Sequence, residues 1–427
     1  SWRRVLLLGS AAGGRVAGAT AGPGGSVLAA GTAMPARAAA GAAAAPRRQP
    51  VLLLAGPRYA FTGQQALARA ATAGVAVTAM ATAAGRQVAV GSANGGPAIW
   101  TAPAGGRWSA DPPGTWATPG LSLTSVTHGD GGWLAVGQLI IRRQAQLVLL
   151  ASRDAVTWQA VTGLRRLAAP GTQLTQAAAG RDGYVLVGQD TVTGRPAAVA
   201  WWSATSGAWS QAAVTPPPGR PGAHPVRQPS QMLAVAAGGP GFVAAGALGS
   251  HPVTWSSADG RSWAATVLPV PAGARSAVLA RIAARGPRVA AIGTELTAAG
   301  QLPFAAVSRD AGRTWREFRL PMPACRAGAG AVAAASQGGA TVSAITAAAS
   351  GFVATGGCGG PGRLDVVVWS SADGRTWTAA SPPVPGLSGP GAQQITALTA
   401  AGTAVTGAGY TATLAGSHPT LWRLRAR

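Results

Sequence analysis

Short apolar runs alternate with polar turns along the whole chain, always in the same order. The stretch 351–377, GFVATGGCGGPGRLDVVVWSSADGRTW, shows the unit most clearly. The apolar run around Phe352 is too short for a helix, and the run 366–368 is β-branched, so both are typical of strands. Between Trp369 and Trp377 lie Asp and Gly, which favour a tight turn. The unit therefore predicts a hairpin with two indoles near its turn, and side chains of that size bury best between packed sheets.

Eight copies of this unit can be counted by the glycine that closes the second apolar run: Gly31, Gly91, Gly137, Gly188, Gly246, Gly293, Gly356 and Gly407. Their spacing of about 45 to 60 residues is that of four-stranded propeller blades. One such sheet cannot bury both of its faces, whereas a closed ring of sheets can. We therefore predict an all-β fold, a single β-propeller over residues 1–427, with eight blades, or seven if the irregular region 9–63 does not form one. The expected blades span roughly 9–63, 75–111, 121–161, 172–213, 230–268, 277–320, 341–380 and 393–427 plus 1–8.

The same pattern predicts which large side chains are buried between blades. They are Phe242, Trp255, Trp263, Trp315, Phe352, Trp369 and Trp377. Only residues 64–73 could form a helix, as a short connection before the second blade. No apolar run reaches the roughly 18 residues that a membrane-spanning helix needs.

The two ends of the chain are expected to complete one blade together. The segment SHPTLW at 417–422 matches the third strand SHPVTW at 250–255, but no fourth strand follows it. The first residues, SWRRVL, match the fourth strand that begins at Ser262. We therefore expect residues 2–7 to pair antiparallel with residues 420–425 and to close the ring. The alternative for residues 1–8 is the remnant of a signal peptide.

The turn is itself a recurring motif. Residues 308–315, SRDAGRTW, fit the pattern S-x-D-x-G-x-T-W, and residues 257–263 and 371–377 fit a form one residue shorter. Residues 152–158 keep Ser, Asp and Trp but lack the glycine. These segments resemble the Asp-box of the BNR-repeat, sialidase-like propellers. The resemblance implies structural aspartates in turns between third and fourth strands, remote from the active site: Asp154, Asp259, Asp310 and Asp373.

Sialidase-like propellers include glycoside hydrolases, so catalytic groups must be considered. The chain lacks the Arg-Ile-Pro motif that is known in sialidases, and Tyr184 occupies a core strand position. A glycosidase needs two carboxylates on one cleft. Most aspartates fall in turns, Glu317 lies on an outer strand, and Glu295 follows a second strand. We expect no catalytic residues, and a diverged sialidase-like glycoside hydrolase is the alternative.

No cofactor or metal site is expected either. The four histidines are isolated, with no carboxylate or cysteine at the spacing of metal ligands. The chain has no lysine, so a phosphate-binding loop of the G-x-x-x-x-G-K-[ST] type is absent.

The formal charge of +23 comes entirely from arginine. It favours anionic partners, although no basic block of the nucleic-acid type occurs, so no specific nucleic-acid binding is expected. Arginines in the loops between strands two and three and between blades should converge on the face opposite the Asp-containing turns, and they are Arg142, Arg143, Arg165, Arg166, Arg195, Arg220, Arg227 and Arg363. Arginine forks suit carboxylates and phosphates. We therefore expect a non-catalytic binding scaffold for an anionic polysaccharide or cell-wall polymer, or for a protein partner.

The composition and the two cysteines suggest an exported bacterial protein, extracellular or at the cell surface, and we expect it to be a monomer. Cys325 lies in a loop between blades, and Cys358 follows the second strand of the next blade. Both loops should lie on one face, so a disulfide is expected. It would close a loop of about 32 residues and stabilise the fold by roughly 3 kcal/mol. The alternative is two buried thiols.

Overall fold

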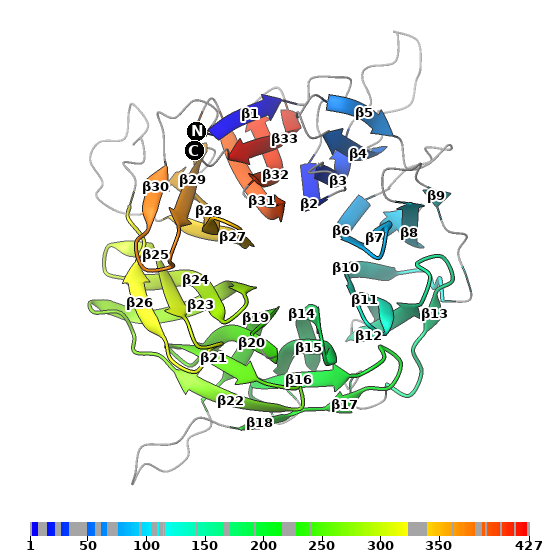
Figure 1. The fold of residues 1–427 in the computed structure, drawn as a ribbon, viewed down its shortest axis with the longest axis horizontal. Helices are drawn as coiled ribbons and strands as arrows, with labels where there is room; N and C mark the ends of the chain where they lie inside the picture. Colours follow the sequence, from blue (N-terminus) through cyan, green and yellow to red (C-terminus); the bar gives the residue numbers. More distant parts are fainter. Residues whose placement is uncertain are drawn as a thin grey trace.

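The computed structural model describes residues 2–6, 15–21, 27–33, 49–55, 61–65, 76–93, 96–103, 109–110, 114, 116–141, 144–164, 167, 171–191, 194–215, 228–239, 241–322, 340–360, 363–380, 387–388, 391–401, 404–413 and 416–424. These residues form strands and no helix. The strands assemble into eight sheets arranged as a ring, with the first strand of each sheet nearest the centre (Figure 1). The fold is a β-propeller, as the apolar pattern predicts.

We number the sheets as blades in chain order, each with its strands from the centre outward. Blade 1 contains β2 (Arg15–Ala21), β3 (Val27–Ala33), β4 (Gln49–Ala55) and β5 (Phe61–Gln65). Blade 2 contains β6 (Ala76–Ala83), β7 (Arg86–Ala93), β8 (Gly96–Pro103) and β9 (Ser109–Ala110). Blade 3 contains β10 (Leu121–Gly129), β11 (Gly132–Ile141), β12 (Gln144–Ser152) and β13 (Gln159–Ala160). Blade 4 contains β14 (Thr172–Gly180), β15 (Gly183–Asp190), β16 (Ala197–Ser203) and β17 (Ser210–Gln211).

Blade 5 contains β19 (Ser230–Gly238), β20 (Gly241–Leu248), β21 (His251–Ser257) and β22 (Ser262–Val267). The short β18 (Ala213–Thr215) adds a fifth strand to it, parallel to β22. Blade 6 contains β23 (Ala274–Arg285), β24 (Arg288–Thr297), β25 (Gly300–Ser308) and β26 (Arg316–Arg319). Blade 7 contains β27 (Thr341–Ala348), β28 (Gly351–Gly360), β29 (Arg363–Ser371) and β30 (Thr378–Ala380). Blade 8 contains β31 (Ala392–Ala401), β32 (Ala404–Thr413), β33 (Gly416–Leu424) and β1 (Trp2–Leu6).

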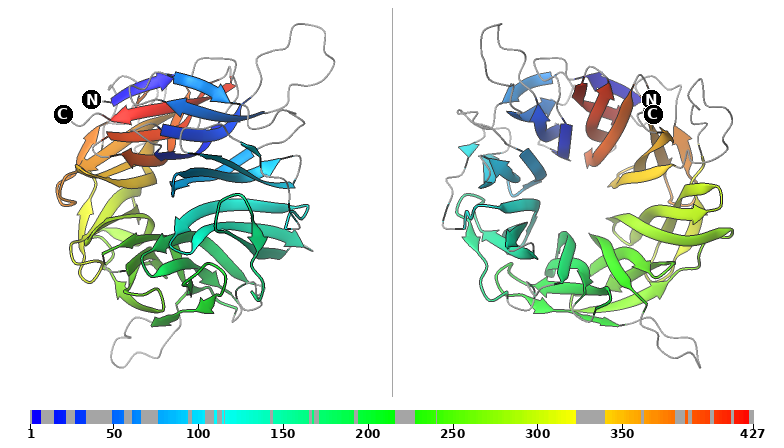
Figure 2. Two further views of the ribbon diagram at one scale, coloured as in Figure 1. Left: turned by 45° about the vertical axis from the view of Figure 1, so that its right-hand side comes forward. Right: turned by 180° about the vertical axis from the view of Figure 1, so that it is seen from behind.

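Blade 8 joins the two ends of the chain. Strand β1 pairs antiparallel with β33, in a register that sets Trp2 opposite Leu424 and Leu6 opposite Thr420. Both views of Figure 2 show the blue β1 beside the red strands of blade 8, close to the two marked ends of the chain. Strand β31 also packs against β2 of blade 1. The predicted closure of the ring by the N-terminal strand is confirmed.

The repeated glycine lies opposite a β-bulge, not at the end of the second strand. In blade 7 the register shifts between Val342 and Ala344, and Gly356 pairs with Val342. A side chain at Gly356 would place its Cβ 1.8 Å from the Thr341 carbonyl oxygen. In blade 8 this position belongs to Gly409, which pairs with Ile395 before the same bulge. Counting Gly407 as the eighth copy was therefore wrong by two residues.

The bulged residue is often a threonine or serine. The hydroxyl of Thr124 donates to Val136 O at 3.2 Å, and that of Thr175 donates to Val187 O at 3.1 Å. The Thr175 hydroxyl also lies 2.8 Å from the Met232 carbonyl oxygen of the next blade. These hydroxyls satisfy carbonyls at the irregular point of the sheet and link neighbouring blades.

Packed blade faces form the core. Six of the seven predicted core side chains are 0–8% exposed: Phe242, Trp255, Trp263, Phe352, Trp369 and Trp377. Trp315 is only partly buried, because it packs at the rim of the cluster between blades 5 and 6. The predicted core position of Tyr184 is also confirmed, since its side chain is 1% exposed and its hydroxyl donates to the Gly132 carbonyl.

The stretch 64–73 does not begin as a helix. Gln64 and Gln65 belong to β5, where they pair with Leu53 and Leu52 of the third strand. The rest of that stretch lies outside the described residues. Nothing in the described part of the chain is a helix of the length and apolarity needed to cross a membrane.

Candidate functional site

Four aspartates organise the turns between the third and fourth strands of blades 3, 5, 6 and 7. In the turn of blade 6, Asp310 Oδ1 accepts hydrogen bonds from the amides of Arg313 and Thr314 at 3.1 and 2.9 Å. The Ser308 hydroxyl donates to the same oxygen at 2.7 Å and accepts from the Gly312 amide at 2.8 Å. Asp259, Asp373 and Asp154 bind their own turns in the same way. Each carboxylate therefore satisfies amides of its own turn.

The last residue of each turn is a tryptophan whose indole N–H donates a hydrogen bond back to the turn. Trp263, Trp315 and Trp377 donate from Nε1 to the carbonyl of the turn glycine at 2.8–3.0 Å. In the turn that lacks a glycine, Trp158 donates to the Ala155 carbonyl at 3.1 Å. Ala155 adopts a φ of 64°, which a glycine would tolerate at less cost.

These hydrogen bonds hold the carboxylates ionised. Hydrogen bonds from the backbone amides of Thr157 and Val156 lower the pKa of Asp154 to about 2. Burial raises the pKa of Asp310, but hydrogen bonds from Thr314, Ser308 and Arg313 outweigh it, and the pKa falls to about 2. A carboxylate bound this way is a poor proton donor at neutral pH, so its chemistry is structural.

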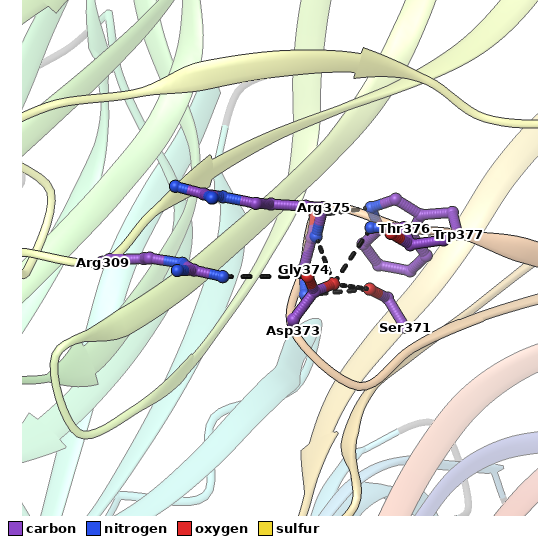
Figure 3. Close-up of polar contacts among 7 residues, drawn as sticks. All are labelled: Arg309, Ser371, Asp373, Gly374, Arg375, Thr376 and Trp377. Carbon is purple, nitrogen blue, oxygen red and sulfur yellow. Dashed lines mark hydrogen bonds and ion pairs between the residues drawn. The ribbon is translucent and has the colours of Figure 1, made fainter.

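Neighbouring turns also contact one another. Arg309 Nη2 of blade 6 lies 3.8 Å from Asp373 Oδ2 of blade 7. Figure 3 shows Arg309 reaching toward Asp373, while the Arg375 side chain runs beside it in the opposite direction. Both partners of the ion pair are over two-fifths exposed, so the pair contributes little to stability.

Arginines gather at the end of the ring that carries these turns, which we call the turn face. It holds the turns between strands one and two and between strands three and four. Its exposed, described arginine side chains include Arg153, Arg181, Arg261, Arg285, Arg288, Arg309, Arg313 and Arg375. The ionised turn aspartates, together with the exposed Asp130 and Asp182, offset part of this positive charge, but arginines outnumber aspartates on this face.

The predicted arginine cluster on the opposite face falls largely outside the described residues. Arg142, Arg143, Arg165, Arg166, Arg220 and Arg227 lie there. Arg195 is exposed in the loop between β15 and β16 of blade 4, and Arg363 begins β29 of blade 7. Their convergence stays a prediction.

The structure brings the two glutamates of blade 6 close to each other, whereas the sequence suggested only that Glu295 follows a second strand and that Glu317 lies on an outer strand. Glu295 on β24 is fully buried, and Arg319 Nε of β26 lies 3.1 Å from its Oε1. Neither Glu295 oxygen accepts a well-aligned hydrogen bond from the described residues. Burial, together with the charge of Glu295, raises the pKa of Glu317 to about 7. With Glu295 inaccessible, the pair cannot flank a substrate.

Cys358 is 1% exposed and disulfide-bonded. Its predicted partner, Cys325, lies outside the described residues. Within the described part, no three side chains of His, Cys, Asp or Glu come together as metal ligands would.

A cleft of about 280 Å³ opens on the rim of the turn face between blades 5 and 6. Thr215 of β18, Ser256 of β21 and Ser262 of β22 line one wall. Ala311 and Arg313, from the turn of blade 6, line the other. The sequence gives no signal for this cleft, because the cleft depends on β18, whose three residues do not belong to the repeat.

Comparisons with solved structures return propellers. A catalytically inactive virginiamycin B lyase from Staphylococcus aureus, solved with quinupristin, is 10% identical over 100% of this chain and 99% of its own, with a TM-score of 0.47. The NanB sialidase of Streptococcus pneumoniae is 12% identical over 81% of this chain and 68% of its own, with a TM-score of 0.38. A thermostable family-43 glycoside hydrolase is 9% identical over 74% of this chain and 95% of its own, with a TM-score of 0.30.

No model of a known protein family matches the chain, and no curated protein sequence matches it.

Proposed function

We propose that this chain is a non-catalytic propeller that acts as a rigid binding scaffold for an acidic partner, with an acidic polysaccharide as the first candidate. The observation that supports this proposal is the turn face, where exposed arginines outnumber the aspartates, four of which bind the backbone of their own turns. Such a surface attracts polyanions and orients them through guanidinium forks. The four Asp-containing turns act in this proposal as structural Asp-boxes.

Export fits this role, since an extracellular or cell-surface scaffold meets acidic cell-wall and matrix polymers. The opposite-face arginines, Arg142 and Arg143 among them, offer a second basic surface under the same proposal. A monomer with two basic ends could hold one long polymer or bring two together.

The test is binding of polygalacturonate and of neutral dextran, measured by calorimetry at low and physiological salt. We expect polygalacturonate to bind, its affinity to fall as salt rises, and dextran to give no signal. Equal binding of the two polymers, or affinity for the acid polymer that is independent of salt, would overturn the proposal.

Two matched variants locate the surface. The first variant replaces Arg153, Arg181 and Arg375 on the turn face with glutamine. The second replaces Arg142, Arg143 and Arg195 with glutamine. Loss of affinity in either variant supports the role and identifies the face. Unchanged affinity in both removes the anion-scaffold idea. Hydrolysis of polymer or of a fluorogenic glycoside by the purified chain would favour the diverged hydrolase instead.

A further inference from the structure

Each turn with a glycine packs on the blade before it at the same point. A Cβ built on Gly260 would lie 3.5 Å from the Cβ of Trp202, and one on Gly312 would lie 3.5 Å from that of Ser256. One on Gly374 would lie 3.6 Å from the Cβ of Val307. Trp202, Ser256 and Val307 each precede the serine that opens their own blade's turn. They are therefore equivalent positions in blades 4, 5 and 6.

What fills this position differs from blade to blade. In blade 4 it is an indole, and the Arg261 guanidinium stacks on the Trp202 ring with its carbon 4.1 Å from the ring centroid. In blade 6 it is the branched side chain of Val307. In blade 5 it is the small Ser256, so the equivalent space beneath Arg313 is the open cleft of about 280 Å³.

The walls of this cleft are more apolar than polar, with hydroxyl groups and one charged side chain placed on them. Thr215 and Ser262 are exposed, and Ser256 is half-buried. Strand pairing puts Thr215 opposite Ala264, and Ala264 opposite Ser256, so the hydroxyls of β18 and β21 share one face. Among the described residues of the lining, Arg313 is the charged group, and no carboxylate lines the cleft.

We propose that this cleft binds one carboxylated sugar unit of an acidic polysaccharide. The proposal rests on the anion-scaffold function and assigns it a site. The Arg313 guanidinium would receive the sugar carboxylate in a fork, and the hydroxyls of Thr215, Ser256 and Ser262 would exchange hydrogen bonds with the ring hydroxyls.

Size, charge and shape favour this class of ligand. The volume is at the small end of ligand pockets, which suits one ring and no more. One guanidinium matches a single carboxylate per sugar better than the several charges of a highly sulfated unit. The indole of Trp202 shows that a ring fits beneath the arginine at the equivalent position of blade 4.

The test uses the full chain and a short oligogalacturonate as the probe, with a heparin disaccharide and a glutamate oligopeptide as comparison ligands. Two variants alter the cleft: Ser256→Trp fills it as Trp202 fills its counterpart, and Arg313→Gln removes the charge. Arg275→Gln is the matched control, because Arg275 is an exposed arginine of the same blade, near the start of β23, and does not line the cleft. Circular dichroism checks that each variant folds.

We expect both cleft variants to weaken oligogalacturonate binding at least tenfold and the control to bind within about twofold of the wild type. If acidic polymer binds but both cleft variants match the wild type, the cleft assignment fails and the scaffold function survives. Equal or tighter binding of the sulfated sugar or the acidic peptide at this site overturns the carboxylated-sugar class. If no acidic polymer binds the wild-type chain, both proposals fail.

Discussion

At the scale of single residues, the glycine opposite the bulge is fixed by the backbone that faces it. The position of a Cβ on Gly356 lies 1.8 Å from the Thr341 carbonyl oxygen and 2.8 Å from the Trp369 ring. Neither neighbour can move far, since one is backbone and the other is a buried indole. Gly356→Ala should therefore destabilise the protein by about 1–3 kcal/mol, the usual cost of overpacking, or by more.

Chemical denaturation of this variant measures the cost. Gly207→Ala is the control, because its Cβ would meet only the Thr205 hydroxyl, at 4.0 Å. A Gly356→Ala variant as stable as the control would show that the bulge can relax.

Glu317 gives the protein a pH dependence of its own. Burial and the charge of Glu295 raise its pKa from 4.5 to about 7. Because the folded state holds the proton more tightly than the unfolded state, stability should fall as the pH rises through this interval. Glu317→Gln should remove that fall and stabilise the protein at pH 8 by roughly 1 kcal/mol, a value discounted for the partial exposure of Glu317.

Thermal unfolding of wild type and variant between pH 4 and pH 8 checks this. The two curves should coincide near the acid end and diverge toward the alkaline end. Parallel curves would mean that the pKa of Glu317 is the same in the folded and unfolded states, which would contradict the prediction.

At the scale of elements, the turn of blade 6 depends on one carboxylate. Asp310→Ala leaves the Arg313 and Thr314 amides without their acceptor, and such losses cost about 1–3 kcal/mol. Since hydrogen bonding lowers the pKa of Asp310 to about 2, its contribution is present above pH 4 and is lost as the pH falls toward 2. Urea unfolding at pH 7 and at pH 3 measures both effects. Asp182→Ala, in a turn between first and second strands, should change stability little.

The indole that seals a turn also joins two blades. Trp377 is 8% exposed and packs in the cluster between blades 6 and 7. Trp377→Ala should cost about 3–5 kcal/mol, as other large-to-small core changes do. Trp315→Ala is an informative comparison, because Trp315 is only partly buried and should cost less. Equal losses in guanidinium unfolding would contradict the burial argument.

The elements were predictable where local pattern decides them, and harder to foresee where two blades meet. The β-branched runs and the D-G turns identify strands and hairpins, since each signal acts within a few residues. The bulge also has a signal, in pairs such as Leu174-Thr175 and Ile395-Thr396, and with it Gly409 could have been chosen over Gly407. The cleft at Ser256 and the approach of Glu317 to Glu295 depend on packing between strands far apart in the chain, which no local pattern encodes.

At the scale of the whole molecule, stability is shared around the ring. First strands contact from blade to blade, and β31 meets β2 to complete the circuit. Each blade therefore packs against two neighbours. Blade 8 is the junction that joins the two ends of the chain, because its outer strand β1 comes from the other end.

Removing residues 1–8 tests this junction. The deletion leaves the backbone groups of β33 that face β1 without partners, over the register from Thr420 to Leu424. An open edge of this kind also invites pairing with other chains. We expect a lower melting temperature, a broad loss of cooperativity and a tendency to aggregate, all detectable by calorimetry and light scattering. Adding a synthetic peptide of residues 1–8 should restore the melting temperature in a concentration-dependent way, because a ligand of the folded state stabilises it by mass action. A peptide of the same composition in scrambled order is the control. If the truncated chain melts like the wild type, or if the scrambled peptide rescues it equally well, β1 is a passive edge and the ring is held closed by β31 and β2 alone.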